Sequence, residues 1–261
     1  MNDFKQALGN KQPLLGTFIK TPHPHNTEVL SKIGFATLCL DAEHAPFDRQ
    51  DLDVCILAAK ANQQHVLVRI PNDHHDTILN TLDLGADGIV IPHVKSAQQL
   101  ETIVKQCYYG HNGRGYAGST RMAGYTTNNM QQNLSHNANN TAVIAQIEDL
   151  DALDDLDAIC QVKGVDCLFI GRMDLTVALG ETNPNATKVL NAVNKIVDVA
   201  NQYGLATGMF IANLDELDDW FKKNVSLFLL GSDHSFMLSG ARQLQTTFEH
   251  HQKNINQENT P

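Results

Sequence analysis

The stretches His65-Val-Leu-Val-Arg-Ile70 and Gly88-Ile-Val-Ile91 decide the fold of this chain. Both are short, almost continuously apolar runs, which is typical of parallel strands that helices cover on both faces. Similar runs occur along the whole chain, at Leu14–Ile19, Phe35–Leu40, Ala142–Ile147, Asp166–Ile170, Ala206–Ile211 and Leu227–Leu230. The sequence therefore predicts eight parallel strands.

Amphipathic helical patterns fill the segments that follow these strands. They span Asn26–Ile33, Asp48–Lys60, Asp73–Leu84, Ser96–Cys107, Asp149–Ile159, Pro184–Tyr203, Leu214–Phe221 and Leu238–Glu249. Strand and helix alternating eight times in 261 residues predict an α/β chain, folded as a single (β/α)8 TIM barrel over residues 1–261. A doubly wound open sheet is the competing architecture, but its glycine fingerprint belongs after the first strand, where none occurs.

Two segments depart from this alternation. Residues 108–140 carry five glycines and seven asparagines between the fourth and fifth strands. We expect a long functional loop with a helical piece there, or an insertion. From His250 onward the chain is polar, which predicts a frayed tail over residues 250–261.

Composition and charge exclude several classes of protein. Hydrophobic residues make up 42% of the chain and charged residues 18%, as in globular proteins. The net charge of −10 argues against a nucleic-acid partner, and no apolar segment approaches the roughly 20 residues of a membrane helix. The five cysteines are widely spaced, and the N-terminus has no apolar signal-peptide core. We therefore expect a cytoplasmic protein with reduced thiols and small-molecule ligands.

Polar residues follow the predicted strands at the rim where such barrels place their active sites. Glu148 and Asp174 come just after neighbouring strands, so their carboxylates are expected to converge on one point. Two carboxylates, with the other positions left to water and substrate, suit Mg²⁺ or Mn²⁺. Both residues also fit ordinary helix N-caps, and spacing alone leaves the two interpretations open.

His44 and Arg69 lie at the ends of the second and third predicted strands. In Asp41-Ala-Glu-His-Ala-Pro46, a histidine beside carboxylates is suited to act as a general base, or it is a polar surface residue. Arg69 needs an anion, which is either a structural carboxylate or a developing oxyanion. By position Asp83 is a turn residue, and Gly171 opens a turn whose amides suit an anion or simply reverse the chain.

Six motifs in this order resemble the HpcH/HpaI aldolase family. They are Asp41-x-Glu-His-Ala-Pro46, Val68-Arg69, Leu82-Asp-x-Gly85, Gln146-Ile-Glu148, Phe169-Ile-Gly171-x-x-Asp174-Leu and Gly231-Ser-Asp233. The chain is most similar to the branch that contains 4-hydroxy-2-oxoheptanedioate aldolase and 2-dehydro-3-deoxyglucarate aldolase. The resemblance implies a class II pyruvate aldolase that uses Mg²⁺, Mn²⁺ or Co²⁺. It also implies a homo-oligomer, a hexamer with exchanged C-terminal helices.

Carried over residue by residue, the resemblance makes His44 the general base and Asp83 the acid that supports it. Arg69 would stabilise the enolate oxygen, Glu148 and Asp174 would hold the metal, and Gln146, Gly171, Met173 and Asp174 would contact the pyruvate moiety. The implied reaction is the reversible cleavage of a 4-hydroxy-2-oxo acid into pyruvate and an aldehyde. The substrate would be a 2-keto-3-deoxy sugar acid or a 4-hydroxy-2-oxo diacid.

Two residues leave alternatives open. Where close relatives carry Gly-Pro, this chain has Gly171-Arg172, and the cation either extends specificity toward acidic substrates or points to solvent. Lys20 is the only lysine at a predicted strand end, so it is the candidate for an aldolase that works through a Schiff base. The rival functions are a citrate-lyase-β-type acyl-CoA lyase, which needs a basic path for the CoA phosphates, and a catalytically silent barrel with a binding role.

Overall fold

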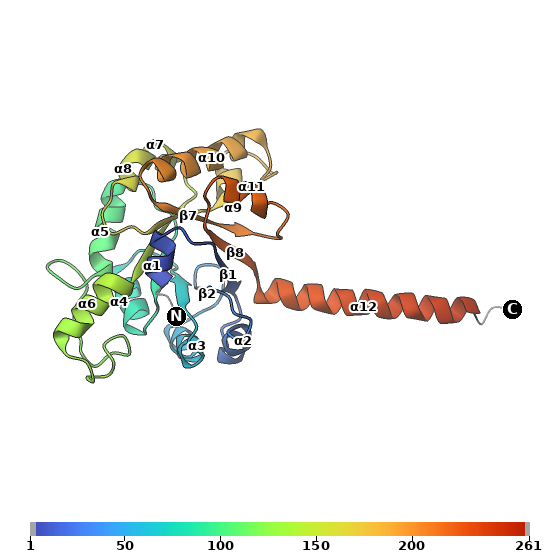
Figure 1. Ribbon diagram of the computed structural model, residues 1–261, viewed down its shortest axis with the longest axis horizontal. Coiled ribbons are helices and arrows are strands. Elements are labelled where there is room, and N and C mark those ends of the chain that lie inside the picture. Colours follow the sequence, from blue (N-terminus) through green and yellow to red (C-terminus); the bar gives the residue numbers. More distant parts are fainter. Residues whose placement is uncertain (1–3, 259–261) are drawn as a thin grey trace.

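Eight parallel strands close into a barrel in the computed structural model, which describes residues 4–258. Each strand pairs with the next one in the sequence, and β8 pairs with β1 to complete the ring (Figure 1). The strands are β1 Leu14–Ile19, β2 Thr37–Asp41, β3 Val66–Arg69, β4 Gly88–Ile91, β5 Ala142–Ile147, β6 Cys167–Ile170, β7 Ala206–Ile211 and β8 Leu227–Ser232. The predicted (β/α)8 barrel is confirmed, and no strand end lies more than two residues from its expected position.

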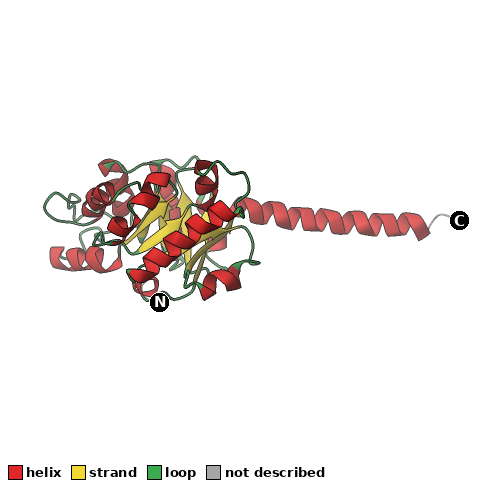
Figure 2. Cartoon of the chain, turned by 90° about the horizontal axis from the view of Figure 1, so that it is seen from above, coloured by secondary structure: helices red, strands yellow, loops and turns green. Residues whose placement is uncertain are grey.

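Helices surround the barrel (Figure 2). They are α1 Phe4–Gly9, α2 Pro24–Leu30, α3 Arg49–Ala61, α4 His75–Asp83, α5 Ala97–Cys107, α6 Met130–Asn140, α7 Leu150–Asp154, α8 Leu156–Cys160, α9 Arg172–Ala178, α10 Thr187–Gln202, α11 Leu217–Lys222 and α12 Asp233–Glu258. Helix α6 is the helical piece expected within residues 108–140. Helices α1 and α9 were not predicted, because each is too short to show a clear apolar period.

A local contact divides the helix that the sequence predicts over Asp149–Ile159. The backbone of Asp155 has φ −102° and ψ 13°, so α7 ends there and α8 begins after it. The Asp155 carboxylate accepts a hydrogen bond at 2.6 Å from the backbone nitrogen of Ala97, the first residue of α5. Because this oxygen satisfies an otherwise unpaired amide at the start of α5, the contact favours a bend over a continuous helix.

Apolar side chains fill the barrel and the layer around it. The interior cluster consists mainly of Phe18, Cys39, Leu67, Val90, Ile144, Phe169 and Leu229. Helix α1 adds Phe4 and Leu8 to this cluster, immediately before β1, and so closes the N-terminal end of the barrel. All five cysteines are buried and unpaired. Apolar side chains fill the interior, so we expect the site to form from the polar groups at the C-terminal ends of the strands.

The last helix leaves the barrel. Helix α12 begins at Asp233, directly after β8, and extends away from the rest of the molecule (Figures 1 and 2). The helix continues to Glu258, whereas the polar sequence predicts a frayed tail from His250 onward. Residues 259–261 lie outside the described part of the chain. Between residues 4 and 258, no helix is both long and apolar enough to cross a membrane.

Candidate active site

A cavity of about 460 Å³ opens at the C-terminal end of the barrel. Eight residues singled out in the sequence line it, namely Lys20, His44, Arg69, Gln146, Gly171, Arg172, Met173 and Asp174. Phe18, Phe169 and Phe210 also line it, so part of the wall is aromatic. The cavity therefore combines an apolar surface with a few convergent polar groups, as small-molecule sites do.

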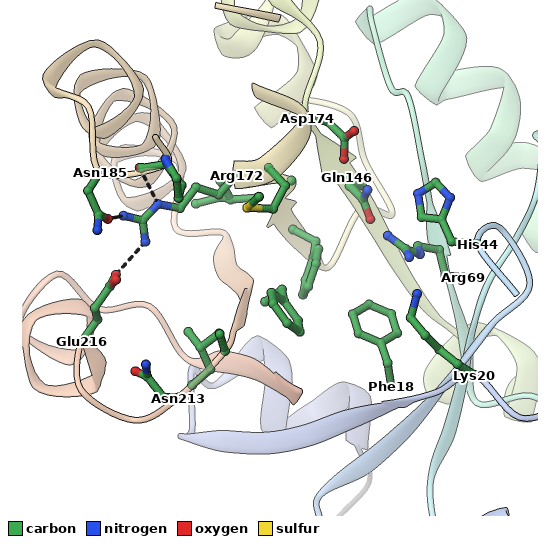
Figure 3. Close-up of a pocket in the computed structure, with 18 residues that line it drawn as sticks. Phe18, Lys20, His44, Arg69, Gln146, Arg172, Asp174, Asn185, Asn213 and Glu216 are labelled. Atoms are coloured by element: carbon green, nitrogen blue, oxygen red, sulfur yellow. Dashed lines mark hydrogen bonds and ion pairs between the residues drawn. The ribbon is translucent and has the colours of Figure 1, made fainter. Parts of the chain in front are cut away.

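The polar groups of the cavity form two separate sets. Figure 3 shows Lys20, His44, Arg69, Gln146 and Asp174 at one end of the cavity, which we call the reaction end. Arg172, Asn185, Asn213 and Glu216 lie at the other end, which we call the distal end. A substrate that spans the cavity thus meets different chemistry at its two ends.

Asp41, the last residue of β2, holds both cations of the reaction end. Its carboxylate is fully buried, and Arg69 lies directly opposite it in the β2–β3 register. Arg69 Nη2 and Nε lie 2.8 Å and 2.9 Å from Asp41 Oδ1, and Lys20 Nζ lies 3.0 Å from Oδ2. Burial alone would raise the pKa of Asp41, but the Arg69 and Lys20 charges outweigh it and lower that pKa.

Arg69 is therefore oriented before any substrate arrives. Besides Asp41, its Nε lies 3.3 Å from Glu43 Oε2, and its guanidinium carbon lies 4.7 Å from the centre of the Phe18 ring. The side chain is only 10% exposed, and Figure 3 shows the guanidinium facing the cavity. A cation fixed in this way is suited to stabilise negative charge that develops in the cavity.

His44 follows β2 at the mouth of the cavity. Its Nε2 lies 3.7 Å from Glu43 Oε2, and its backbone nitrogen donates to Asp41 Oδ1 at 3.2 Å. About half of the side chain is exposed. The ring is thus placed next to a carboxylate and open to the cavity, as a general base that must reach a substrate requires.

Glu148, just after β5, is buried and accepts hydrogen bonds from two sides. Its Oε1 accepts from the backbone nitrogen of His93 at 2.9 Å, and its Oε2 accepts from the side-chain amide of Gln146. Burial raises the pKa of Glu148, although the bonds from Gln146 and His93 offset part of the rise. The Asp174 carboxylate makes a smaller contribution to the rise in this pKa.

The turn after β4 brings a histidine to the same place. His93 has φ +53°, which is uncommon for a residue other than glycine, and its bond to Glu148 holds this conformation. The imidazole Nδ1 lies 3.0 Å from Asp149 Oδ2, and Nε2 lies 3.4 Å from Glu43 Oε1. Burial alone would lower the pKa of His93, but Asp149, Glu148 and Glu43 raise it.

This group of side chains fits a divalent cation. Glu43, His93 and Glu148 each offer one ligand atom, and the three atoms lie within 4.8 Å of one another. Gln146 Oε1 is buried and finds no hydrogen-bond partner within the described residues. Carboxylate and amide oxygens are the donors that Mg²⁺ and Mn²⁺ prefer, so the residues present suit such an ion.

Gly171 allows the turn after β6 to pass directly over Glu148. A Cβ atom on Gly171 would lie 2.6 Å from the Cβ of Glu148 and would also overlap its Oε2. No side chain is tolerated at such a distance, so the close approach requires glycine. The same turn leads into α9, whose first turn carries Asp174.

The structure does not bring Asp83 to His44 within this chain. Asp83 ends α4, which returns the chain to the start of β4, so this residue lies toward the other end of the barrel. Its carboxylate is 3.9 Å from Nη1 of the buried Arg114, and burial raises its pKa. Asp41 and Glu43 are the acids that contact His44 instead.

The structure rules out one of the two roles that the sequence left open for Arg172, that of a side chain directed to solvent. Its Nη1 lies 2.6 Å from Glu216 Oε2, its Nε donates to the carbonyl oxygen of Pro184 at 2.9 Å, and its Nη2 donates to Asn185 Oδ1. The side chain is only 12% exposed. It is therefore neither directed to solvent nor left as an unpaired cation.

Glu43 and His93 are the site residues that sequence reasoning did not assign. Both follow predicted strands, in Asp41-Ala-Glu-His44 and in Pro92-His93, so a signal for each was present. Their convergence on Glu148 depends on the closure of the barrel and on the left-handed backbone of His93, and neither is visible in the spacing.

Three comparisons with known proteins identify relatives of this chain. Residues 14–239 match the family model for HpcH/HpaI aldolase/citrate lyase. A 5-keto-4-deoxy-D-glucarate aldolase of Shigella boydii is 31% identical over 250 residues, covering 95% of this chain and 96% of that protein. A hydroxypyruvate/pyruvate aldolase of Roseobacter denitrificans is 33% identical over 227 residues, covering 82% and 87%.

A solved structure gives the same result for the fold. An HpcH/HpaI aldolase/citrate lyase family protein from Burkholderia cenocepacia superposes with a TM-score of 0.90 at 27% identity, covering 95% of this chain and all of that one. The family match spans the barrel from β1 to the start of α12 and includes every strand end that lines the cavity. The chain belongs to the HpcH/HpaI aldolase/citrate lyase family of carbon–carbon lyases.

Proposed function

We propose that this protein is a divalent-metal-dependent aldolase. It cleaves a 4-hydroxy-2-oxo acid into pyruvate and an aldehyde, and it also catalyses the reverse aldol addition. One observation carries the proposal: His44, Arg69, Gln146 and Asp174 line a single cavity, and the buried Glu148 carboxylate accepts a hydrogen bond from Gln146. A general base, a fixed cation and a set of oxygen ligands are what this reaction requires.

The residues of the reaction end divide the work between the two halves of the substrate. Gln146, Gly171, Met173 and Asp174 contact the pyruvate moiety. His44 removes the proton from the 4-hydroxyl group, and the C4–O bond becomes the carbonyl of the aldehyde as the C3–C4 bond breaks. The electron pair of that bond becomes the enolate of pyruvate, and Arg69 stabilises the enolate oxygen. Protonation at C3 then completes pyruvate.

Glu148 and Asp174 hold the divalent ion in this proposal, with Glu43 and His93 beside Glu148. When bound, Mg²⁺ or Mn²⁺ supplies Lewis-acid polarisation of the 2-oxo group. The Gly171 turn, which leads to Asp174, passes close to Glu148, and the bond from Gln146 orients one Glu148 oxygen.

The contacts of Lys20 favour this mechanism over a Schiff-base mechanism. A Schiff-base lysine must present a neutral amine to a carbonyl carbon, usually in an apolar site or beside another cation. Lys20 Nζ instead forms an ion pair at 3.0 Å with the buried carboxylate of Asp41. Lys20 is thus better suited to balance the charge of Asp41 than to attack a substrate.

Proton exchange of pyruvate tests the proposal without knowledge of the aldehyde. The protein is incubated with pyruvate in D₂O with Mg²⁺, and the methyl signal is followed by proton NMR. Loss of the signal with Mg²⁺, and its retention after EDTA, is the expected result. Exchange that persists in EDTA would point to Lys20, and no exchange with Mg²⁺, Mn²⁺ or Co²⁺ would overturn the proposal in favour of an acyl-CoA lyase.

We also propose that α12 packs against a second copy of the chain. Met237, Leu244 and Phe248 recur at helical spacing on one side of this helix and are 57%, 73% and 63% exposed. Asp233 fixes the start of the helix, because its carboxylate accepts hydrogen bonds from the backbone nitrogens of Lys20 and Thr21 at 2.9 Å and 3.0 Å. A rigidly anchored helix with an uncovered apolar side is suited to a neighbouring subunit.

A further inference from the structure

The distal end of the cavity is organised around Arg172. Its three nitrogens contact Glu216, the Pro184 carbonyl and Asn185, so each already has an acceptor. These contacts join the first turn of α9 to the loop before α10 and to the residue that precedes α11. Figure 3 shows Arg172 directed away from the reaction end and toward Glu216 and Asn185.

Glu216 is held in its ionised form. It also accepts a hydrogen bond from Trp220 Nε1 at 3.0 Å, and the Arg172 guanidinium carbon lies 5.8 Å from the centre of the Trp220 ring. Burial alone would raise the pKa of Glu216, but the bonds from Arg172 and Trp220 outweigh it and lower that pKa. The positive charge of Arg172 is therefore compensated by a carboxylate at 2.6 Å.

The distal end offers a substrate one ion pair and two side-chain amides. The distal end is lined by this ion pair, by Pro184 and by the side chains of Asn185 and Asn213. Among the described residues that line the distal end, Arg172 is the only cation, and it is paired with the Glu216 carboxylate. A second carboxylate on the substrate would thus find no cation that is free of a carboxylate partner, whereas hydroxyl or carbonyl groups would meet two amides able to donate and accept hydrogen bonds.

We propose that the Arg172–Glu216 ion pair makes the distal end selective for an uncharged polar aldehyde half over one of the same length that carries a carboxylate. The inference rests on the proposed aldolase function and narrows its substrate class. It favours monocarboxylic 2-keto-3-deoxy sugar acids over substrates with a second carboxylate. The discrimination arises because a carboxylate loses hydration in this partly buried cavity without gaining an unpaired cation in return.

A matched pair of aldehydes tests the inference. Succinate semialdehyde and its methyl ester have the same carbon chain and differ in charge. We expect kcat/KM for addition of pyruvate, in the presence of Mg²⁺, to be at least about tenfold higher for the ester in the wild-type protein. The ratio of kcat/KM for the two aldehydes, measured on one preparation, does not depend on the amount of folded enzyme.

Glu216→Gln supplies the decisive variant. Glutamine keeps the shape of the side chain and an oxygen that accepts from Arg172 and Trp220, but it leaves Arg172 as an uncompensated cation. We expect the ratio to shift toward the acidic aldehyde by about tenfold or more. Arg172→Gln, which leaves Glu216 uncompensated, should shift the ratio in the opposite direction, so the test does not depend on one variant.

Asp218→Asn is the matched control, because Asp218 is an exposed carboxylate on α11 outside the cavity. The ratio of kcat/KM for the two aldehydes in this variant should equal that of the wild type. A wild-type preference for the acidic aldehyde, or equal ratios in the wild type and both cavity variants, would overturn the inference. Pyruvate exchange in the wild type separates the two levels of the argument. Exchange without the expected selectivity refutes only the inference, whereas absence of exchange refutes the aldolase proposal itself.

Discussion

The carboxylate of Asp41 lies 2.8 Å from Nη2 of Arg69, and the two residues are direct neighbours in the β2–β3 register. This places a buried ion pair at the point where the barrel interior meets the cavity. The pair fixes the cation that faces the substrate before the substrate binds. Barrel stability and the geometry of the site therefore depend on the same contact.

The first prediction concerns Asp41→Asn. Removing this buried carboxylate leaves Arg69 and Lys20 without their shared partner, and we expect the free energy of unfolding to fall by about 3 kcal/mol. Because the pKa of Asp41 is lowered in the folded state, the wild-type advantage is present above about pH 4 and is lost as the pH falls through the folded-state value. Urea titrations at pH 7 and pH 3 should show a gap that narrows at the lower pH.

Asp219→Asn is the control for this effect. Asp219 pairs with Lys222 at 3.0 Å, but both side chains are largely exposed on α11, so its loss should leave the urea midpoint unchanged. Equal midpoints for the two variants at pH 7 would contradict the importance assigned to the Asp41 ion pair.

The second prediction concerns the general base. His44→Ala should slow both aldol cleavage and pyruvate exchange by about a hundredfold or more. The side chain is about half exposed, so the circular dichroism spectrum and the thermal midpoint should stay close to those of the wild type. His75→Ala, an exposed histidine at the start of α4, should keep full activity. Near-wild-type turnover in His44→Ala would exclude His44 as the base.

The third prediction concerns the metal ligands. Glu148→Gln replaces a carboxylate oxygen by an amide, and we expect Mn²⁺ affinity to fall at least about tenfold. Isothermal titration calorimetry with Mn²⁺ alone measures this directly, without any assumption about the substrate. Glu101→Gln, on the exposed side of α5, should bind Mn²⁺ like the wild type. Unchanged affinity in Glu148→Gln would remove this residue from the metal site.

The fold could be predicted from the sequence because the parallel strands are recognisable as apolar runs. Runs such as Val66–Arg69 and Gly88–Ile91 are buried on both faces, so they are apolar throughout and easily recognised. The division of α7 from α8 at Asp155 could not be predicted, because it depends on a hydrogen bond with Ala97, which is distant in the sequence. Local patterns therefore predict the strands well and the irregular helices less well.

The site was predictable only where a residue directly follows a strand. His44, Arg69, Gln146 and Asp174 share the cavity because the C-terminal ends of all eight strands lie on one rim. Asp83 was assigned a role by resemblance alone, and its position at the end of α4 lies away from that rim. The Arg172–Glu216 pair was not predictable, because the first residue of α9 and the residue before α11 lie 44 positions apart in the sequence.

The fourth prediction concerns α12. If its apolar side packs on a second copy, Leu244→Glu and Phe248→Glu should each weaken the assembly, because a carboxylate is costly to bury at an interface. Light scattering should then show a mass closer to the 28.8 kDa of the single chain. Thr246→Glu adds the same charge on the other side of the helix and should leave the mass unchanged. A wild-type mass of one chain would refute the assembly proposal.

The fifth prediction tests whether the Gly171 turn shapes the metal site. Gly171→Ala forces a Cβ to within 2.6 Å of the Cβ of Glu148, so either the turn or the carboxylate must move. We expect a loss of about 1–3 kcal/mol in unfolding free energy, as for other overpacked sites, together with weaker Mn²⁺ binding. Gly240→Ala is the control, since a Cβ there meets nothing within 4 Å and alanine favours the helix. Destabilisation without a change in Mn²⁺ affinity would mean that Glu148 binds the ion independently of this turn, and Asp174 would then no longer be supported as its partner ligand.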